Sequence, residues 1–502
     1  MKLALNLQKT AVAVSTLLLT FGGFSCQNNL LEPTSQIQFS DQVVFSNPSR
    51  IALQVNGLYS FVKVGGFLGG RVQVYGDIRA NDFINRATNN VTGTAVWNHT
   101  LTETSVNDVI SMWGAGYAAI NQINVFLAGM DANAGSFVAP TFPSNFAATS
   151  LNYQGEARFL RALCYYTMLQ YYARPYTDGN GTRPGLPLRL RAEMGPDANA
   201  LARSTVGQVY DQILLDLKFA EDNLPLTYGA TAFNNITRAH RNTAIALKVR
   251  VYLTMGRYSD VVTEANKLVP TSAPFVAPNG VAFALNSSIA GVFAPPQETA
   301  ESILSFPFTA QDTPGTQNQL AYYYLPNSLG GNNGEYSLNI SAGGVLSEPG
   351  FGAADARRTS LTALSGTERF LTKYPTGTPY TDKAPVMRYA EVLLSLAEAR
   401  VRTTNSIDAQ ALALLNAVRG RSNPTGLYTA TGLGSVSAML DALLLERRIE
   451  FLGEGLRNTD IMRLNASIPA KATIGIIDPA NPLYVWPIPS TELQTNNLIV
   501  RN

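Results

Sequence analysis

The chain has 502 residues, of which 46% are hydrophobic and 14% are charged, and its formal net charge at pH 7 is +2. This length allows one large domain or two to three smaller ones. A charge balance near zero without a basic block argues against nucleic acid as a partner, and two cysteines are too few for a disulfide framework.

The first 25 residues have the pattern of an export signal. Lys2 and Lys9 form a short basic region, and the apolar segment 10–24 that follows is too short to span a bilayer. Ser25 and Cys26 come directly after it, and a small residue before a cysteine suggests a lipobox. We therefore expect residues 1–25 to be a lipoprotein signal peptide and Cys26 to carry lipid. The alternative is ordinary cleavage beside an unmodified cysteine.

Residues 26–269 are expected to form an N-terminal helical region. Apolar residues recur there at helical intervals, which predicts helices over residues 45–62, 107–130, 152–172, 205–223, 241–255 and 258–268. Ser204 or Thr205 stands where a helix cap is needed. Only Gly256 and Arg257 separate the last two segments, so these form a helix–turn–helix pair.

Segments without helical period interrupt these helices. Residues 132–150 and 178–202 are irregular, and residues 270–380 are rich in Gly, Pro, Asn, Ser and Thr. We expect 270–380 to be a loop-rich insertion with a few short strands. Long loops on a rigid scaffold usually carry recognition, so this region is expected to face the ligand.

Residues 381–502 repeat the helical design, with predicted helices over 385–402 and 407–419. Paired helices with small residues at their contacts resemble tetratricopeptide (TPR) units. One such pair cannot bury its apolar face alone, so the pairs are expected to stack. The predicted fold is therefore mainly all-α, a TPR-like scaffold of helical pairs carrying the loop-rich insertion.

The segment 446–463 carries eight charged residues at helical spacing, with apolar residues threaded between them. Three opposite-sign pairs lie three residues apart, which predicts local ion pairs inside or beside a packed helical core. We expect a structural network that consists of Glu446, Arg447, Glu450, Glu454, Arg457, Asp460 and Arg463. Glycosidase chemistry on Glu450 and Glu454 is disfavoured, because the surrounding arginines keep both carboxylates ionised.

No other pattern indicates catalysis, so we expect a protein that is not an enzyme. Its only histidines are His99 and His240, without a zinc motif or a nucleophile elbow, and neither a metal nor a cofactor is expected. Aromatic and amide side chains in predicted loops are the candidates for ligand binding: Tyr75, Trp97, Asn98, Tyr322, Tyr323, Tyr324, Asn332 and Tyr336. Packing within the loops is the competing interpretation; it is favoured for the segment around Tyr75 and equal to stacking for Trp97 and the 322–324 run.

The charged segment resembles the C-terminal signature of the SusD/RagB family, which reads roughly E-R-x-x-E-x-x-x-E-G-x-R-x-x-D-x-x-R. Leu456 departs from it, where the family often has a polar residue. Further segments match family motifs in the same order along the chain, at residues 76–82, 156–163, 355–358, 388–399 and 486–489. The resemblance therefore covers most of the chain beyond the signal peptide.

The resemblance implies a lipid-anchored protein of the cell outer membrane that faces outside. Such proteins bind nutrients, either glycans or peptides, and work with a TonB-dependent, SusC-like transporter. In relatives, aromatic side chains near the relative positions of Trp97 and residues 322–324 often form the ligand arc. The alternatives are a secreted glycoside hydrolase on an all-α scaffold and a helical-repeat adaptor or adhesin without a small ligand.

Overall fold

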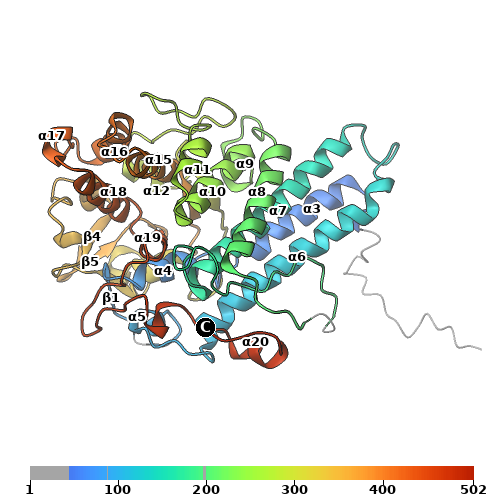
Figure 1. Ribbon diagram of the computed structural model, residues 1–502, viewed down its shortest axis with the longest axis horizontal. Coiled ribbons are helices and arrows are strands. Elements are labelled where there is room, and N and C mark those ends of the chain that lie inside the picture. The colour runs from blue at the N-terminus through green and yellow to red at the C-terminus, as the bar shows by residue number, and fades with distance from the viewer. Residues whose placement is uncertain (1–43, 88, 196–198) are drawn as a thin grey trace, which may run out of the picture.

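Helices are the main regular elements of the computed structural model, which describes residues 44–87, 89–195 and 199–502 (Figure 1). Cys26 and the predicted signal peptide lie outside the described residues. Among the described residues, no helix is both long enough and apolar enough to cross a bilayer.

Three long helices pack together at one end of the molecule: α3 (Pro48–Val62), α6 (Ser111–Asn133) and α7 (Phe146–Tyr172) (Figure 1). Ile51, Val55 and Leu58 of α3 are buried, as their spacing predicts. The prediction that residues 132–150 are irregular is wrong at both ends. Helix α6 continues to Asn133, and α7 begins at Phe146, whose ring packs against Phe142.

The next helices stack as successive neighbours, which confirms the TPR-like arrangement. Each packs on the one before it along the series α7, α8 (Val206–Asn223), α10 (Arg241–Thr254), α11 (Tyr258–Ala265), α15 (Tyr389–Thr404) and α16 (Ala409–Ser422). Thr205 caps α8: its side chain accepts the Gln208 N–H, and the Gln208 side chain bonds back to the Thr205 N–H.

The C-terminal helices differ from the sequence expectation in two places. Residues 385–388 belong to strand β6 (Ala384–Arg388) instead of the start of a helix. The charged segment is divided between α18 (Val436–Glu450) and α19 (Leu456–Arg463), because the intervening turn uses left-handed backbone at Gly453 (φ 85°) and Gly455 (φ 81°).

The insertion contains short strands, as expected, in three two-stranded antiparallel sheets. Strand β2 (Ser302–Phe306) pairs with β6, and β4 (Thr362–Ser365) pairs with β5 (Glu368–Leu371). Strand β1 (Phe83–Asn85) pairs with β3 (Tyr336–Leu338), with Phe83 opposite Leu338. This last pairing places the loop that follows β1 beside the loop that precedes β3.

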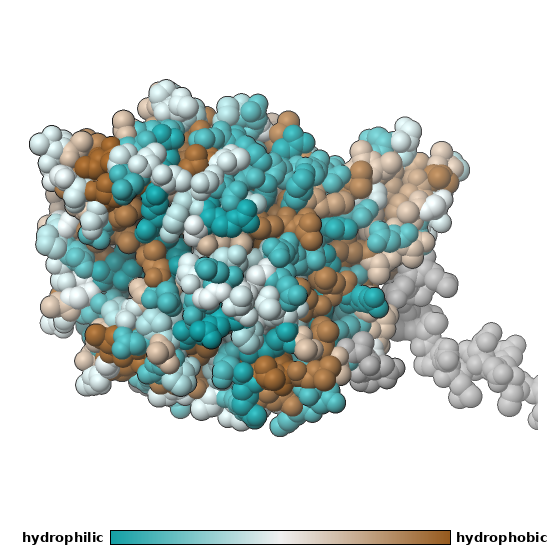
Figure 2. All heavy atoms as spheres, in the orientation of Figure 1, coloured by the Kyte–Doolittle hydropathy of each residue, from teal (hydrophilic) through white to brown (hydrophobic). Residues whose placement is uncertain are grey.

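The remaining helices are short: α4 (Arg71–Ile78), α5 (Thr94–Asn98), α9 (Ala232–Thr237), α12 (Ile289–Phe293), α13 (Leu320–Tyr324), α14 (Ala356–Ser360), α17 (Ala430–Leu433) and α20 (Ser490–Thr495). One large apolar core runs through the helices and the insertion, and Cys164 is buried in it as a small core residue. On the face drawn in Figure 2, apolar residues lie in separate patches among polar ones.

Candidate functional site

The charged residues of α18 and the following turn form the centre of a buried ion-pair cluster. Glu450 pairs with Arg357, Arg388 and Arg421 at once. The connected pairs contain five carboxylates and five cations: Asp355, Glu301, Glu446, Glu450, Glu454, Arg357, Lys373, Arg388, Arg419 and Arg421. These residues come from the insertion, from β6 and from the C-terminal helices, so the cluster joins segments that are far apart in sequence.

The prediction of local pairs is correct only for Asp460 and Arg463, whose Oδ1 and Nε lie 2.8 Å apart. Arg447 reaches Asp460 at 2.9 Å, not Glu450. Glu454 bonds Lys373 and Arg388, while among the described residues the only carboxylate within ion-pair distance of Arg457 is Asp82, at 3.9 Å. The helix break between residues 450 and 456 separates the partners that an unbroken helix would have brought together.

The same cluster leaves its carboxylates without the properties of a catalytic acid. Nearby arginines hold the pKa of Glu450 well below its usual range, and Arg388 and Lys373 lower the pKa of Glu454. Burial raises the pKa of Asp77 to about 7, but this carboxylate is enclosed and accepts the N–H groups of Gly453 and Gly455. Each of these carboxylates is therefore engaged within the protein, Glu450 and Glu454 by cations and Asp77 by backbone N–H groups. No group of His, Cys, Asp or Glu in the described part of the chain is placed to hold a metal ion.

Most aromatic residues predicted to bind ligand lie in the core, which corrects the prediction that their rings stack on a ligand. Tyr75, Tyr323, Tyr324 and Tyr336 have no exposed surface, and Trp97 is 7% exposed. A ring without an open face offers a sugar nothing to stack on. As placed, these rings are packing residues.

Sequence alone could not reveal this packing, because these residues follow no helical or strand period. The 322–324 run lies in the short helix α13, and the ring of Tyr323 stacks on Tyr336 at a centroid distance of 6.3 Å. The indole N–H of Trp97 donates to the Phe83 carbonyl at 3.0 Å. Asn98, in the last turn of α5, is half-buried.

A small surface patch remains at the outer edge of this aromatic cluster. It consists of Gln317, Tyr322, Asn332, Asn333 and Tyr380, and we name it the Tyr322–Tyr380 patch. Asn332 and Asn333 are exposed, Gln317 and Tyr380 are half-buried, and Tyr322 is buried, with 8% of its surface exposed. The rings of Tyr322 and Tyr380 meet edge to face, with centroids 6.5 Å apart.

The hydroxyl groups of the patch have unused hydrogen-bonding capacity. Tyr322 Oη accepts from Asn333 Nδ2 at 2.9 Å and from Gln317 Nε2 at 3.4 Å, so its own proton is still available. The Tyr380 hydroxyl has no partner among the described residues. Asn333 also donates to Glu335, which accepts from Thr92 in the loop after β1. The network therefore connects two loops across the β1–β3 pair.

Two residues of the patch also carry backbone strain. Gln317 (φ 59°) and Tyr380 (φ 61°) both occupy the left-handed region, which costs a non-glycine residue about 1–3 kcal/mol. Strain of this kind clusters at ligand-binding and switch regions. Sequence analysis missed Tyr380 and Gln317, because nothing in the sequence shows that residue 380 packs against residue 322.

Comparison with known proteins agrees with this architecture. A family profile described as "SusD family" matches residues 342–502, and one described as "Starch-binding associating with outer membrane" matches residues 31–253. SusD-like protein P2 of Formosa agariphila is 23% identical over 99% of both chains. The structure of a SusD superfamily protein from Bacteroides fragilis is 31% identical, with a TM-score of 0.79 over 91% of this chain and 99% of that one.

Two structures named for what they bind share the fold. Surface glycan-binding protein A from Bacteroides uniformis is 22% identical, with a TM-score of 0.68 over 90% of this chain and 99% of that one. A laminarin binding SusD-like protein is 20% identical, with a TM-score of 0.68 over 91% and 99%. At such identities the likeness establishes the fold alone. The match to the Bacteroides fragilis protein, at higher identity and over nearly its whole length, establishes more: the chain belongs to the SusD family.

Proposed function

We propose that this protein binds a glycan at the Tyr322–Tyr380 patch and works as a lipid-anchored nutrient receptor on the outer membrane. The observation that carries the proposal is the combination of paired tyrosine rings, exposed amides and a buried hydroxyl without a partner. The names of the laminarin binding and surface glycan-binding neighbours support a glycan, and the description of the matching profile supports the outer membrane.

The chemistry of the patch suits a sugar better than a charged or purely apolar ligand. Each sugar hydroxyl both donates and accepts, and the Asn332 amide can do the same, while Asn333, whose N–H groups bond Tyr322 and Glu335, can accept through its Oδ1. The unused Tyr322 proton and the free Tyr380 hydroxyl add one donor and one donor–acceptor group. The partly exposed ring of Tyr380 offers an apolar face for sugar C–H groups.

Binding without catalysis fits the carboxylates near the patch. Glu335, which accepts from Asn333, is 2% exposed and also bonds Thr92. Glu368 pairs with Arg86 at 2.6 Å. A glycosidase needs a protonated carboxyl beside the scissile bond. Glu335 is enclosed and Glu368 is held in an ion pair, and Asp382, whose pKa burial raises to about 6, is 7% exposed and accepts from Gln297 and Thr376. We therefore propose a receptor that hands intact ligand to a TonB-dependent, SusC-like transporter.

Substitutions in the Tyr322–Tyr380 patch should weaken glycan binding and leave the fold intact. Tyr380→Ala removes a stacking face and should raise the Kd of the best glycan about tenfold or more, since one aromatic stack contributes about 1–3 kcal/mol. Tyr322→Phe removes the hydroxyl that orients Asn333 and should raise it about fivefold, the value of about 1 kcal/mol. Calorimetry against a panel of glycans and peptides measures both effects.

Tyr153→Ala is the matched control, because Tyr153 is a partly buried tyrosine on α7. Its affinity for the same glycan should equal that of the unchanged chain. If both patch variants bind the best glycan as tightly as the control, the patch is not the site. Binding of peptides but no glycans would replace the proposed ligand, and binding of neither would favour the adaptor or adhesin.

Anchoring is tested separately at Cys26. Cys26→Ala should move the protein from the outer-membrane fraction to the soluble fraction, because acyl chains contribute about 0.8 kcal/mol of membrane affinity per buried CH₂. Cys164→Ala is the matched control, since Cys164 is buried in α7 and unavailable for lipid. A Cys26→Ala protein that stays with the membrane, together with a wild type that carries no lipid by mass spectrometry, would refute the anchor.

Co-purification of a TonB-dependent transporter with the anchored protein tests the proposed partner.

A further inference from the structure

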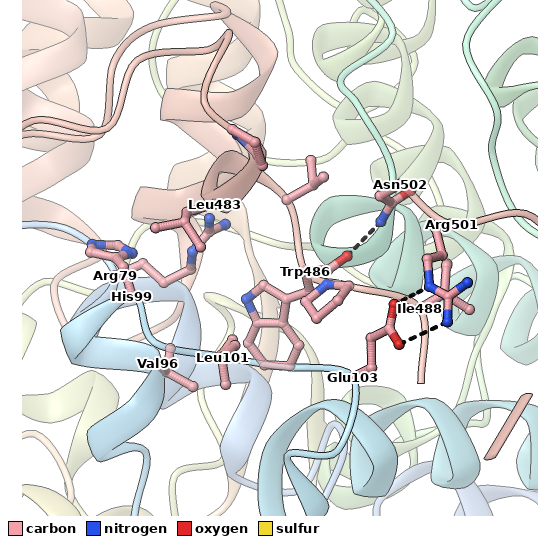
Figure 3. A pocket seen from close by; sticks show the side chains of 13 residues that line it. Arg79, Val96, His99, Leu101, Glu103, Leu483, Trp486, Ile488, Arg501 and Asn502 are labelled. Carbon is pink, nitrogen blue, oxygen red and sulfur yellow. Dashed lines mark hydrogen bonds and ion pairs between the residues drawn. The ribbon is translucent and has the colours of Figure 1, made fainter. Parts of the chain in front are cut away.

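We propose that a cavity beside Trp486 binds a small oxyanion, namely a carboxylate or a sulfate group carried by a sugar or free in solution. The cavity measures about 200 Å³ and lies between the loop that follows α5 and the C-terminal segment 482–502 (Figure 3). It shares no residue with the Tyr322–Tyr380 patch. The inference is therefore independent of the proposed function.

The cavity has two distinct ends. Arg79 and His99 lie at one end and the ion pair between Glu103 and Arg501 lies at the other, with Trp486 between them (Figure 3). Apolar residues complete the wall, among them Val96, Leu101, Val485 and Ile488. A group with one charged end and an apolar body fits such a lining.

Two buried nitrogens at this cavity have no hydrogen-bond partner among the described residues. They are Trp486 Nε1, on a side chain that is 1% exposed, and His99 Nε2, on one that is 7% exposed. Figure 3 shows the indole nitrogen on the side of the ring that faces Arg79 and His99. A buried polar group left unpaired costs about 1–3 kcal/mol, so a ligand that bonds these atoms would recover that cost.

The same end of the cavity carries positive charge without a neighbouring carboxylate. The Arg79 guanidinium donates to Asn458 Oδ1 at 2.6 Å and to the Tyr484 carbonyl at 2.8 Å. Behind it, Lys471 Nζ donates to the carbonyls of Ile78 and Arg79 at 2.6 and 2.8 Å. All four acceptors are neutral, so neither charge is paired with a carboxylate, although Lys471 Nζ also lies 5.2 Å from the centroid of the Trp97 ring.

This arrangement departs from the rest of the chain. Other buried cations of the described residues pair with carboxylates, as Arg161 does with Asp216 and Arg250 with Glu391. Arg71 has no partner within ion-pair distance, but the charge of Asp108 acts on it. Arg79 and Lys471 have no such neighbour, and burying an unpaired charge is expensive.

The pKa values reflect the missing countercharge. Burial lowers the pKa of Arg79 to about 10 and that of Lys471 well below its usual range. Burial and the charges of Lys471 and Arg79 lower the pKa of His99 to about 3. Arg79 and Lys471 would therefore gain from an anion bound nearby, whereas the neutral His99 keeps further positive charge away from the site.

Glu103 does not supply that anion. Its carboxylate pairs with Arg501 Nε at 2.6 Å, and both side chains are partly exposed at the far end of the cavity. The Glu103 carboxylate is not among the groups whose charges shift the pKa of Arg79. The positive end is therefore open to an external oxyanion, which a guanidinium and an indole N–H can both bond.

The test uses the indole signals of the ¹⁵N-labelled mature protein. The chain has three tryptophans, so a proton–nitrogen correlation spectrum shows three indole N–H signals, and the signal missing in Trp486→Phe identifies Trp486. Sodium glucuronate, sodium sulfate and glucose are titrated at constant ionic strength. We expect glucuronate or sulfate, but not glucose, to shift the Trp486 signal and leave that of Trp113 in place.

Variants decide whether the shift reports a bound anion. Trp486→Phe and Arg79→Lys should each weaken the calorimetric Kd of the effective anion about tenfold, because the first removes a hydrogen bond to a charged group and the second removes the fork of guanidinium donors. Trp113→Phe is the matched control, because it removes an indole N–H that donates to Glu492 instead. A response to glucuronate alone identifies a sugar carboxylate, and a response to sulfate identifies a sulfate site. No shift with either anion, an equal shift with glucose, or unchanged affinity in both variants would overturn the proposal.

Discussion

Replacing Glu450 by glutamine is expected to lower the free energy of unfolding by about 3–5 kcal/mol, the usual cost of removing one partner from a buried ion pair. The side chain is fully buried and pairs with Arg357, Arg388 and Arg421. An amide keeps the shape but loses the charge. Five cations would then share four carboxylates, all in a place that water cannot reach.

The matched control is an exposed ion pair. Lys218 and Asp222 lie one turn apart on α8, with side chains 70% and 51% exposed. Asp222→Asn should change the free energy of unfolding by less than about 1 kcal/mol, because exposed pairs contribute little. Denaturant unfolding followed by circular dichroism compares the two variants. Equal and small effects would show that the buried cluster does not stabilise the fold.

Glu450→Gln also separates a structural role from a catalytic one. Affinity for the best glycan, measured per folded molecule, should not change, because Glu450 lies in the core and apart from the Tyr322–Tyr380 patch. Unchanged stability together with loss of turnover of some substrate would instead point to catalysis. The cluster connects the insertion to the C-terminal helices, so its loss should loosen both together.

The sequence predicts the helices well because their apolar residues recur at regular intervals. Strand β6 was not predicted. Its residues 384–388 are all buried, and the apolar pattern of a short buried segment fits a helix and a strand equally well. The prediction of local ion pairs was mostly wrong for a different reason. Arg388 and Glu450 are 62 residues apart, and no local spacing shows that they meet.

The aromatic residues show the same limit. Tyr324 packs on Tyr374 at a centroid distance of 6.0 Å, and Tyr75 packs on Trp486 at 5.7 Å. Both partners come from distant segments, so composition around Tyr324 or Tyr75 could not show which way the ring points. The Trp486 cavity was equally hidden, because it forms only where the C-terminal segment meets the loop after α5.

A close backbone contact between α4 and α19 predicts the second large effect. Gly76 of α4 lies against Gly455 at the start of α19, and a Cβ atom on Gly76 would stand 2.0 Å from the Gly455 carbonyl oxygen. Backbone atoms cannot move aside as a side chain can. Asp77 also bonds the N–H groups of Gly453 and Gly455, so the two segments cannot separate without losing these bonds as well.

Gly76→Ala should therefore lower the free energy of unfolding by at least about 3 kcal/mol, the range of overpacking combined with broken buried hydrogen bonds. Gly57→Ala in α3 is the matched control, because a Cβ there meets nothing within 4 Å. Alanine inside a helix is favoured over glycine by about 0.5–1 kcal/mol, so the control should be slightly more stable than the unchanged chain. Thermal unfolding compares the two substitutions, and the opposite signs separate a steric clash from a general effect of alanine. A Gly76→Ala protein within about 1 kcal/mol of the unchanged chain would mean that α4 and α19 do not approach this closely in solution.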